Sequence, residues 1–216
     1  MNLFRPVGLA ELALIFDSEM KAFPPRLPDQ PIFYPVMNRD YAIQIARDWN
    51  APSEQSGFAG YVTEFKISSD YVKQFPVQTV GASLHQELWV PAQQLDEFNS
   101  KIEGTIQVTD AFFGEQFKGF IPQDYGLRRK NAVEQIVALS ATFNYNGMDF
   151  IFETAANRKS VWLNFLFWEQ RDFTNEGVSI PQRDRVLKAI RELWKDRDIW
   201  KGRSPALPMP HQTENK

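Results

Sequence analysis

The sequence predicts an α+β protein that folds as two units. Short strand patterns alternate with short helical patterns over residues 3–113, and glycine, proline or polar residues separate them. Glycine, proline, aspartate and a run of three basic residues then cluster within residues 119–129, as in a linker between domains. We therefore expect a first domain at residues 1–122, a small α+β domain at residues 123–200 and a disordered tail at residues 201–216.

In the first domain the apolar pattern predicts each element in turn. Apolar residues recur at helical spacing after Gly8, and a second apolar helical face follows Asn38, which is a good N-cap residue. A third, short helix is expected after Pro91, with Leu95 and Phe98 turned inward. The expected strands cover residues 3–7, 32–36, 58–67, the stretch around Glu87 and residues 104–113.

The second domain is expected to run helix–strand–strand–strand–helix. A helical pattern covers residues 133–140, and the Asn146-Gly147 pair is typical of a type I′ hairpin turn between two strands. Residues 161–168 are nearly all apolar or aromatic, which predicts a central strand. Ser179 is expected to cap the last helix. No set of residues in this half suggests chemistry, so we interpret it as an accessory or recognition unit.

The composition argues against several classes of function. The net charge of −3 and the lack of a basic stripe argue against nucleic-acid binding, because phosphates are bound by clustered Lys and Arg. Without cysteine the chain has no thiolate nucleophile or cysteine-ligated zinc, and His85 and His211 are too few for a histidine-rich metal centre. We expect no metal. Since neither a signal peptide nor an apolar run of about 18 residues is found, we expect a cytoplasmic protein that contacts no membrane.

Glu87 is the strongest candidate for a catalytic residue. It opens the apolar stretch ELWVP, which ends at a proline and leads into a helix-like segment. A carboxylate at the start of an apolar strand lies either at a solvated edge or in a cleft, where burial and neighbouring charges tune it. Arg5, at the end of the first strand, and the tyrosines Tyr34 and Tyr41 are the other candidates. Taken singly, they read as a surface arginine and as core aromatic residues.

Taken together, the segments that hold these residues resemble the ADP-ribosyltransferase-like superfamily, in particular small bacterial proteins of ADP-ribosylation type. The resemblance covers roughly residues 3–113 and rests on Phe4-Arg5, on the phrase FYPV-N--YA--IA--W from Phe33, and on QELWVP followed by FN--I-G-I-V. It implies a split, mostly antiparallel β core with flanking helices. It also implies NAD as co-substrate, without a metal.

The resemblance further implies a role for each candidate residue. Glu87 would be the catalytic glutamate, Arg5 would bind the ribose and phosphate region of NAD, and an aromatic residue, Tyr34 or else Tyr41, would lie against the nicotinamide. His85 and Gln86 would face the acceptor. Members that modify arginine carry a second carboxylate two residues before the glutamate, where this chain has His85. The acceptor is therefore left open, a protein being favoured over a nucleic acid, and plain NAD hydrolysis is the other outcome.

These roles agree with the chemistry of the reaction. Cleaving the bond between nicotinamide and ribose places positive charge on the sugar in an oxocarbenium-like transition state, which a nearby carboxylate stabilises. An arginine can clamp a phosphate or ribose oxygen through two hydrogen bonds, and an aromatic ring can hold the leaving nicotinamide. The alternative is a non-catalytic protein of this type, for example an immunity-type partner of a toxin.

Overall fold

In the computed structural model of the chain, residues 1–196, 200 and 205–208 are described. The chain divides into two compact units, Met1–Glu115 and Gln116–Pro208. The predicted disordered tail lies for the most part outside the described residues.

The boundary between the units follows Glu115, whereas the sequence places it after residue 122. The segment beyond Glu115 is held by the second unit. The side-chain amide of Asn164 accepts a hydrogen bond from the Phe120 N–H (2.8 Å) and donates one to the Phe120 carbonyl (3.0 Å). Gln135 also donates to that carbonyl (2.8 Å).

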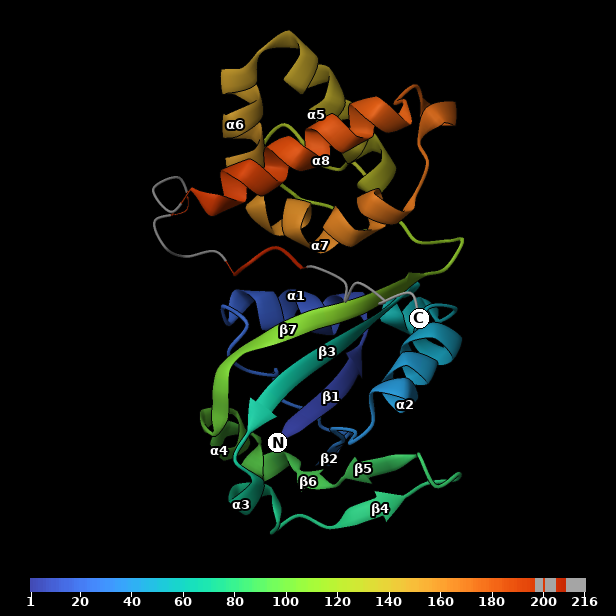
Figure 1. Cartoon of the computed structure of the whole chain (residues 1–216), viewed down its shortest axis with the longest axis vertical. Helices are drawn as coiled ribbons and strands as arrows, with labels where there is room; N and C mark the ends of the chain where they lie inside the picture. Colours follow the sequence, from blue (N-terminus) through green and yellow to red (C-terminus); the bar gives the residue numbers. More distant parts are fainter. Residues whose placement is uncertain (197–199, 201–204, 209–216) are drawn as a thin grey trace, which may run out of the picture. The chain divides into compact units, whose positions relative to one another are not determined.

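The first unit is a mixed α+β structure with antiparallel strands (Figure 1). Its strands are β1 (Asn2–Val7), β2 (Ile32–Phe33), β3 (Ala59–Ile67), β4 (Val77–Thr79), β5 (Gln86–Leu88), β6 (Val90–Pro91) and β7 (Ile102–Phe113). Its α-helices are α1 (Leu9–Asp17), α2 (Arg39–Gln44), α3 (Ser69–Val72) and α4 (Leu95–Ser100), and a π-helical turn (Ile45–Asn50) continues α2. The sequence predicts most of these elements; α3 and β4 lie where it predicts only a polar connection.

The strands that carry the candidate residues are linked into one antiparallel series. Strand β3 lies between β1 and β7, and β4 pairs with β5. Val36 connects the two groups, because it is bridged to Phe4 of β1 on one side and to Glu87 of β5 on the other. Strands β2 and β6 form a separate two-residue ladder. Glu87 is therefore inside the series and not at its edge.

The two faces of this sheet are covered by different elements. Phe4 and Val36 pack with the buried side chains of Tyr41, Ala42 and Ala46 from α2 and the π-helical turn. Side chains alternate along a strand, so Arg5, next to Phe4, projects from the opposite face, and there its guanidinium lies 4.7 Å from the Phe33 ring centre. On that face Phe33 packs with the buried rings of Phe23 and Phe98.

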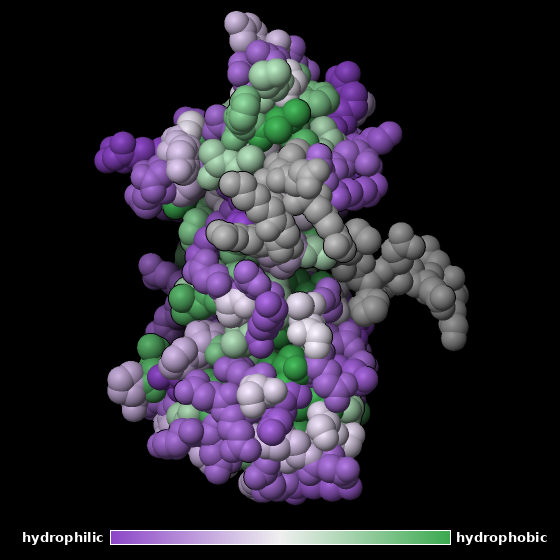
Figure 2. Space-filling view, turned by 90° about the vertical axis from the view of Figure 1, so that its left-hand side faces the viewer, coloured by the Kyte–Doolittle hydropathy of each residue, from purple (hydrophilic) through white to green (hydrophobic). Residues whose placement is uncertain are grey.

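In its described residues the second unit is helical (Figure 1). Its α-helices are α5 (Ala132–Tyr145), α6 (Gly147–Ala156), α7 (Arg158–Gln170) and α8 (Ile180–Lys195). Ser179 caps α8, as the sequence predicts. Figure 2, which views the molecule from the side where α6 lies, shows hydrophobic surface among hydrophilic residues in this unit. Exposed apolar side chains on and next to α6 are Tyr145, Met148, Ile151 and Phe152.

The predicted hairpin and its strands are wrong. Asn146 ends α5 and serves as the N-cap of α6, and its side-chain oxygen accepts a hydrogen bond from the Met148 N–H (2.9 Å). Asparagine suits both an N-cap and a type I′ turn, and the residues on either side decide between them. Here the residues on both sides continue into amphipathic helices, so the pair joins two helices.

The predicted central strand at residues 161–168 is also wrong, because this run forms the middle of α7. Every residue from Ser160 to Trp168 is buried in α7. A helix that is buried on all sides has no polar face, and its sequence then looks like that of a central strand. The expected small α+β unit is therefore a helical unit in the part of the chain that the structure describes.

Candidate functional site

Main-chain hydrogen bonds on both sides hold the strand of Glu87 in place. Gln86 accepts a bond from the Met37 N–H (3.0 Å), and Leu88 donates to the Pro35 carbonyl (2.8 Å). On its other side β5 pairs with β4. Glu87 is half-buried and, being paired with Val36, projects from the face that carries Phe4 and Val36. We call this side of the sheet the Glu87 face. The position of the carboxylate is therefore set by the sheet.

The carboxylate of Glu87 is hydrogen-bonded to an aromatic side chain that packs against a second one. The Trp89 indole N–H donates a hydrogen bond to Glu87 Oε1 (2.9 Å), and the Tyr34 and Trp89 rings meet edge to face with centres 5.9 Å apart. Trp89 is 38% exposed, so this aromatic pair is open to solvent. Sequence reasoning missed Trp89, although its spacing of two residues from Glu87 places both on one side of a strand.

His85 and Tyr41 lie on the other side of Glu87. Their rings stack with centres 4.3 Å apart and planes 17° apart, and His85 Nε2 is 3.1 Å from Gln44 Oε1. Burial raises the pKa of the Tyr41 phenol, and the negative charge of Glu87 raises it further. Gln86 is exposed and projects away from this group. The structure thus gathers Glu87, Tyr34, Tyr41 and His85 in one region, with Gln86 outside it.

Arg5 does not share this region. Its Nε and Nη2 donate to the two carboxylate oxygens of Glu11 (2.9 and 3.3 Å), and its Nη1 donates to the Tyr34 carbonyl (3.1 Å). The side chain is only 9% exposed. Since Arg5 and Glu87 project from opposite faces of the sheet, Arg5 does not lie with Tyr34 and Glu87 around one NAD site, as the roles implied by the resemblance would require. Arg5 reaches the Glu87 region only through the main chain of Tyr34.

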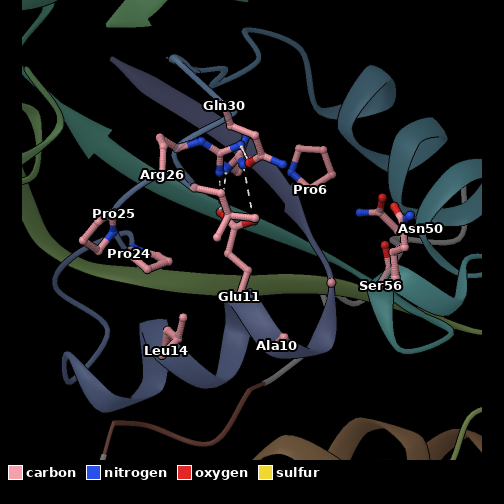
Figure 3. Close-up of a pocket in the computed structure, with 14 residues that line it drawn as sticks. Pro6, Ala10, Glu11, Leu14, Pro24, Pro25, Arg26, Gln30, Asn50 and Ser56 are labelled. Atoms are coloured by element: carbon pink, nitrogen blue, oxygen red, sulfur yellow. Dashed lines mark hydrogen bonds and ion pairs between the residues drawn. The ribbon is translucent and has the colours of Figure 1, made fainter. Parts of the chain in front are cut away.

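Arg5 instead lines a pocket of about 390 Å³ that sequence reasoning did not identify (Figure 3). Glu11 lies between two arginines there, because Arg26 Nη1 is 3.8 Å from its Oε1. The loop that carries Arg26 contains several prolines and reads in the sequence as a plain connection. The lining residues are Arg5, Pro6, Gly8, Ala10, Glu11, Leu14, Pro24, Pro25, Arg26, Leu27, Gln30, Asn50, Gln55 and Ser56.

No family model, curated protein sequence or solved structure matches the chain. Within the described part of the chain no three His, Cys, Asp or Glu side chains gather in a way that could hold a metal ion. No helix there is long and apolar enough to cross a membrane. An assignment of function therefore depends on the geometry around Glu87.

Proposed function

We propose that the protein is an NAD-dependent ADP-ribosyltransferase, with transfer to water as its hydrolytic variant, and that Glu87 is its catalytic carboxylate. The observation that carries the proposal is the position of Glu87, which is half-buried within an antiparallel series of strands, bonds to the Trp89 indole and lies near Tyr41. A nicotinamide riboside suits a carboxylate beside accessible aromatic rings. The nicotinamide ring can stack on an aromatic side chain, and the carboxylate stabilises the positive charge that develops on the sugar. The ADP-ribosyltransferase-like architecture is part of this proposal.

In the proposed reaction the bond between ribose C1′ and the nicotinamide nitrogen breaks, and nicotinamide leaves with the bonding electrons. A nucleophilic acceptor then forms a new bond to C1′ and releases a proton. The Glu87 carboxylate stabilises the oxocarbenium-like transition state, because its negative charge is fixed close to the sugar before the reaction begins. Tyr34, with Trp89 at its edge, offers a surface for nicotinamide, and Tyr41 lies on the opposite side of the carboxylate.

The proposal changes the role of Arg5. Its nitrogens bond to Glu11 and to the Tyr34 carbonyl, so Arg5 positions the Tyr34 main chain and is not required to touch NAD. His85 and the exposed Gln86 are left on the acceptor side. The net charge of −3 favours a protein acceptor over an anionic nucleic acid.

Incubation of the purified chain with labelled NAD tests the proposal, with nicotinamide release and labelled protein as readouts. Glu87→Gln keeps the shape of the side chain and removes its charge, so turnover should fall by roughly a hundredfold while NAD still binds. Glu97→Gln changes an exposed glutamate on α4 and should leave turnover unchanged. If calorimetry finds no binding at millimolar NAD, the enzyme proposal fails and the non-catalytic alternative replaces it. If NAD binds and Glu87→Gln turns over normally, the catalytic residue is misassigned.

A further inference from the structure

The pocket beside Arg5 has the charge and shape of a binding site for a small anion. Three segments form it: the end of β1 with the first turn of α1, the proline-containing loop around Arg26, and the stretch from Asn50 to Ser56. Figure 3 shows the side chains of Arg26, Gln30 and Glu11 on one side of it and those of Asn50 and Ser56 on the other. We call it the Arg26 pocket.

Positive charge in the Arg26 pocket exceeds negative charge. Glu11 is the one carboxylate among the lining residues, whereas Arg5 and Arg26 both carry guanidinium groups. The side chains of Arg5 and Arg26 are 9% and 12% exposed, so water compensates little of this charge. Burial lowers the pKa of Arg26, and the positive charge of Arg5 lowers it further. An anion in the pocket would balance the extra charge.

Arg26 has hydrogen-bonding capacity left for such an anion. Glu11 and the Tyr34 carbonyl take the donors of Arg5, while Arg26 donates from Nη2 to Gln30 and approaches Glu11 only at 3.8 Å. Its Nε is buried, and no acceptor among the described residues bonds to it. A buried guanidinium nitrogen without a partner is unfavourable, so a small rotation of the Arg26 side chain that lets its free donors bond to a phosphate or carboxylate oxygen in the pocket would be favourable.

The rest of the wall suits a hydroxylated compound. Asn50, Gln55 and Ser56 provide amide and hydroxyl groups that can bond to sugar hydroxyls, and Pro24 and Pro25 provide apolar contact. Gly8 leaves the start of α1 without a side-chain cap, so its first N–H groups add partial positive charge. A volume of about 390 Å³ is at the lower end of small-molecule pockets and suits a sugar phosphate or a mononucleotide.

We propose that the Arg26 pocket binds a small phosphate monoester of a hydroxylated compound, with Arg26 as the residue that binds the phosphate. The site is separate from the proposed NAD site, because Arg5 and Glu87 project from opposite faces of the sheet. The inference does not depend on the proposed enzymatic activity.

Ribose 5-phosphate is the probe for the test, with ribose and inorganic phosphate as partial ligands. Calorimetry and thermal unfolding of the full chain should show binding of ribose 5-phosphate, weaker binding of phosphate and none of ribose. Arg26→Gln should weaken binding at least tenfold, since it removes a charged hydrogen-bond donor. Arg185→Gln alters an exposed arginine of the second unit and should leave binding unchanged. Should Arg26→Gln misfold, Arg26→Lys keeps the positive charge but loses the paired N–H donors of the guanidinium, and it should bind ribose 5-phosphate more weakly than the native chain.

Two further measurements separate this site from the proposed NAD site. Glu87→Gln should bind ribose 5-phosphate as the native chain does, even if NAD turnover is lost. NAD should not compete with ribose 5-phosphate. Competition would overturn the inference of a separate site, and so would the absence of ribose 5-phosphate binding at millimolar concentration or equal affinity in Arg26→Gln.

Discussion

The imidazole of His85 stacks on the phenol ring of Tyr41, with ring centres 4.3 Å apart. This contact connects α2, which carries Tyr41, to the residue just before β5. The hydrogen-bonding distance between His85 and Gln44, also on α2, adds a second connection. Through these contacts α2 fixes the direction in which the chain enters the strand of Glu87. The region around the carboxylate is therefore ordered by side-chain packing as well as by main-chain hydrogen bonds.

The first prediction concerns the ionisation of Tyr41. In Glu87→Gln the pKa of Tyr41 should be lower than in the native chain, because a nearby negative charge is removed, and it should stay above its ordinary value because burial remains. Because the folded chain disfavours the phenolate, Tyr41 leaves stability unchanged below about pH 10, where the phenol is neutral in both states, and lowers stability as pH rises from there through the folded pKa. NMR titration of the tyrosine Cζ resonances measures this pKa, and the resonance that is missing in Tyr41→Phe identifies Tyr41. An unchanged Tyr41 pKa in Glu87→Gln would show that the two groups are not close.

The second prediction concerns Glu11. Glu11→Gln leaves the buried Arg5 and Arg26 without a counter-charge and should destabilise the first unit by about 2–4 kcal/mol. Glu103→Gln breaks an exposed pair with Lys66 and should change nothing measurable. Hydrogen exchange of β3 amides measures the stability of this unit alone. If both variants behave alike, the charges of the Arg26 pocket are solvated and the two-arginine arrangement does not matter to stability.

The third prediction concerns close packing against β3. A Cβ on Gly60 would lie 1.9 Å from the Ala46 carbonyl oxygen, a main-chain atom of the π-helical turn. Gly60→Ala should therefore cost about 2–4 kcal/mol, since the backbone must move. Gly104 has a φ of +79° and open space around it, so Gly104→Ala should cost only about 1–2 kcal/mol of backbone strain. Hydrogen exchange of the β3 amides compares the stability of the two variants, and an equal loss in both would contradict the close contact between residue 60 and the Ala46 carbonyl.

In the first unit local sequence signals agree with tertiary structure, which is why the prediction of its elements succeeds. The alternating residues Tyr61, Thr63 and Phe65 of β3 are buried, as the strand pattern predicts, and Val62 on the other face is buried as well. Asn38 caps α2, because its side-chain oxygen accepts hydrogen bonds from free N–H groups at the start of the helix. In the second unit the apolar run of α7 has a sequence pattern that fits both a central strand and a fully buried helix. Packing against α5, α6 and α8 decides in favour of the helix.

The candidate site could be predicted in part. Glu87, Tyr34, Tyr41 and His85 lie in the same region, as their positions next to paired strands suggest. The side on which Arg5 projects depends on the register between Phe4 and Val36, and sequence patterns do not determine register across a long connection. Arg26 was missed for a different reason. Its loop has no periodic pattern, and its importance comes only from burial beside Glu11.

The last prediction distinguishes the helical connection at Gly147 from the hairpin that the sequence suggests. Gly147 is the first residue of α6, with open space where a Cβ would lie, so Gly147→Ala should leave the second unit as stable or raise its stability by about 0.5 kcal/mol. In a type I′ turn the same change would place alanine at positive φ and cost about 1–2 kcal/mol. Gly177 provides the matched control, because it has a φ of +85° and open space, and Gly177→Ala should lower stability by about that amount. Urea unfolding followed by the fluorescence of the buried Trp162 and Trp168 measures both variants. Equal losses in the two variants would support the turn and contradict the helix start.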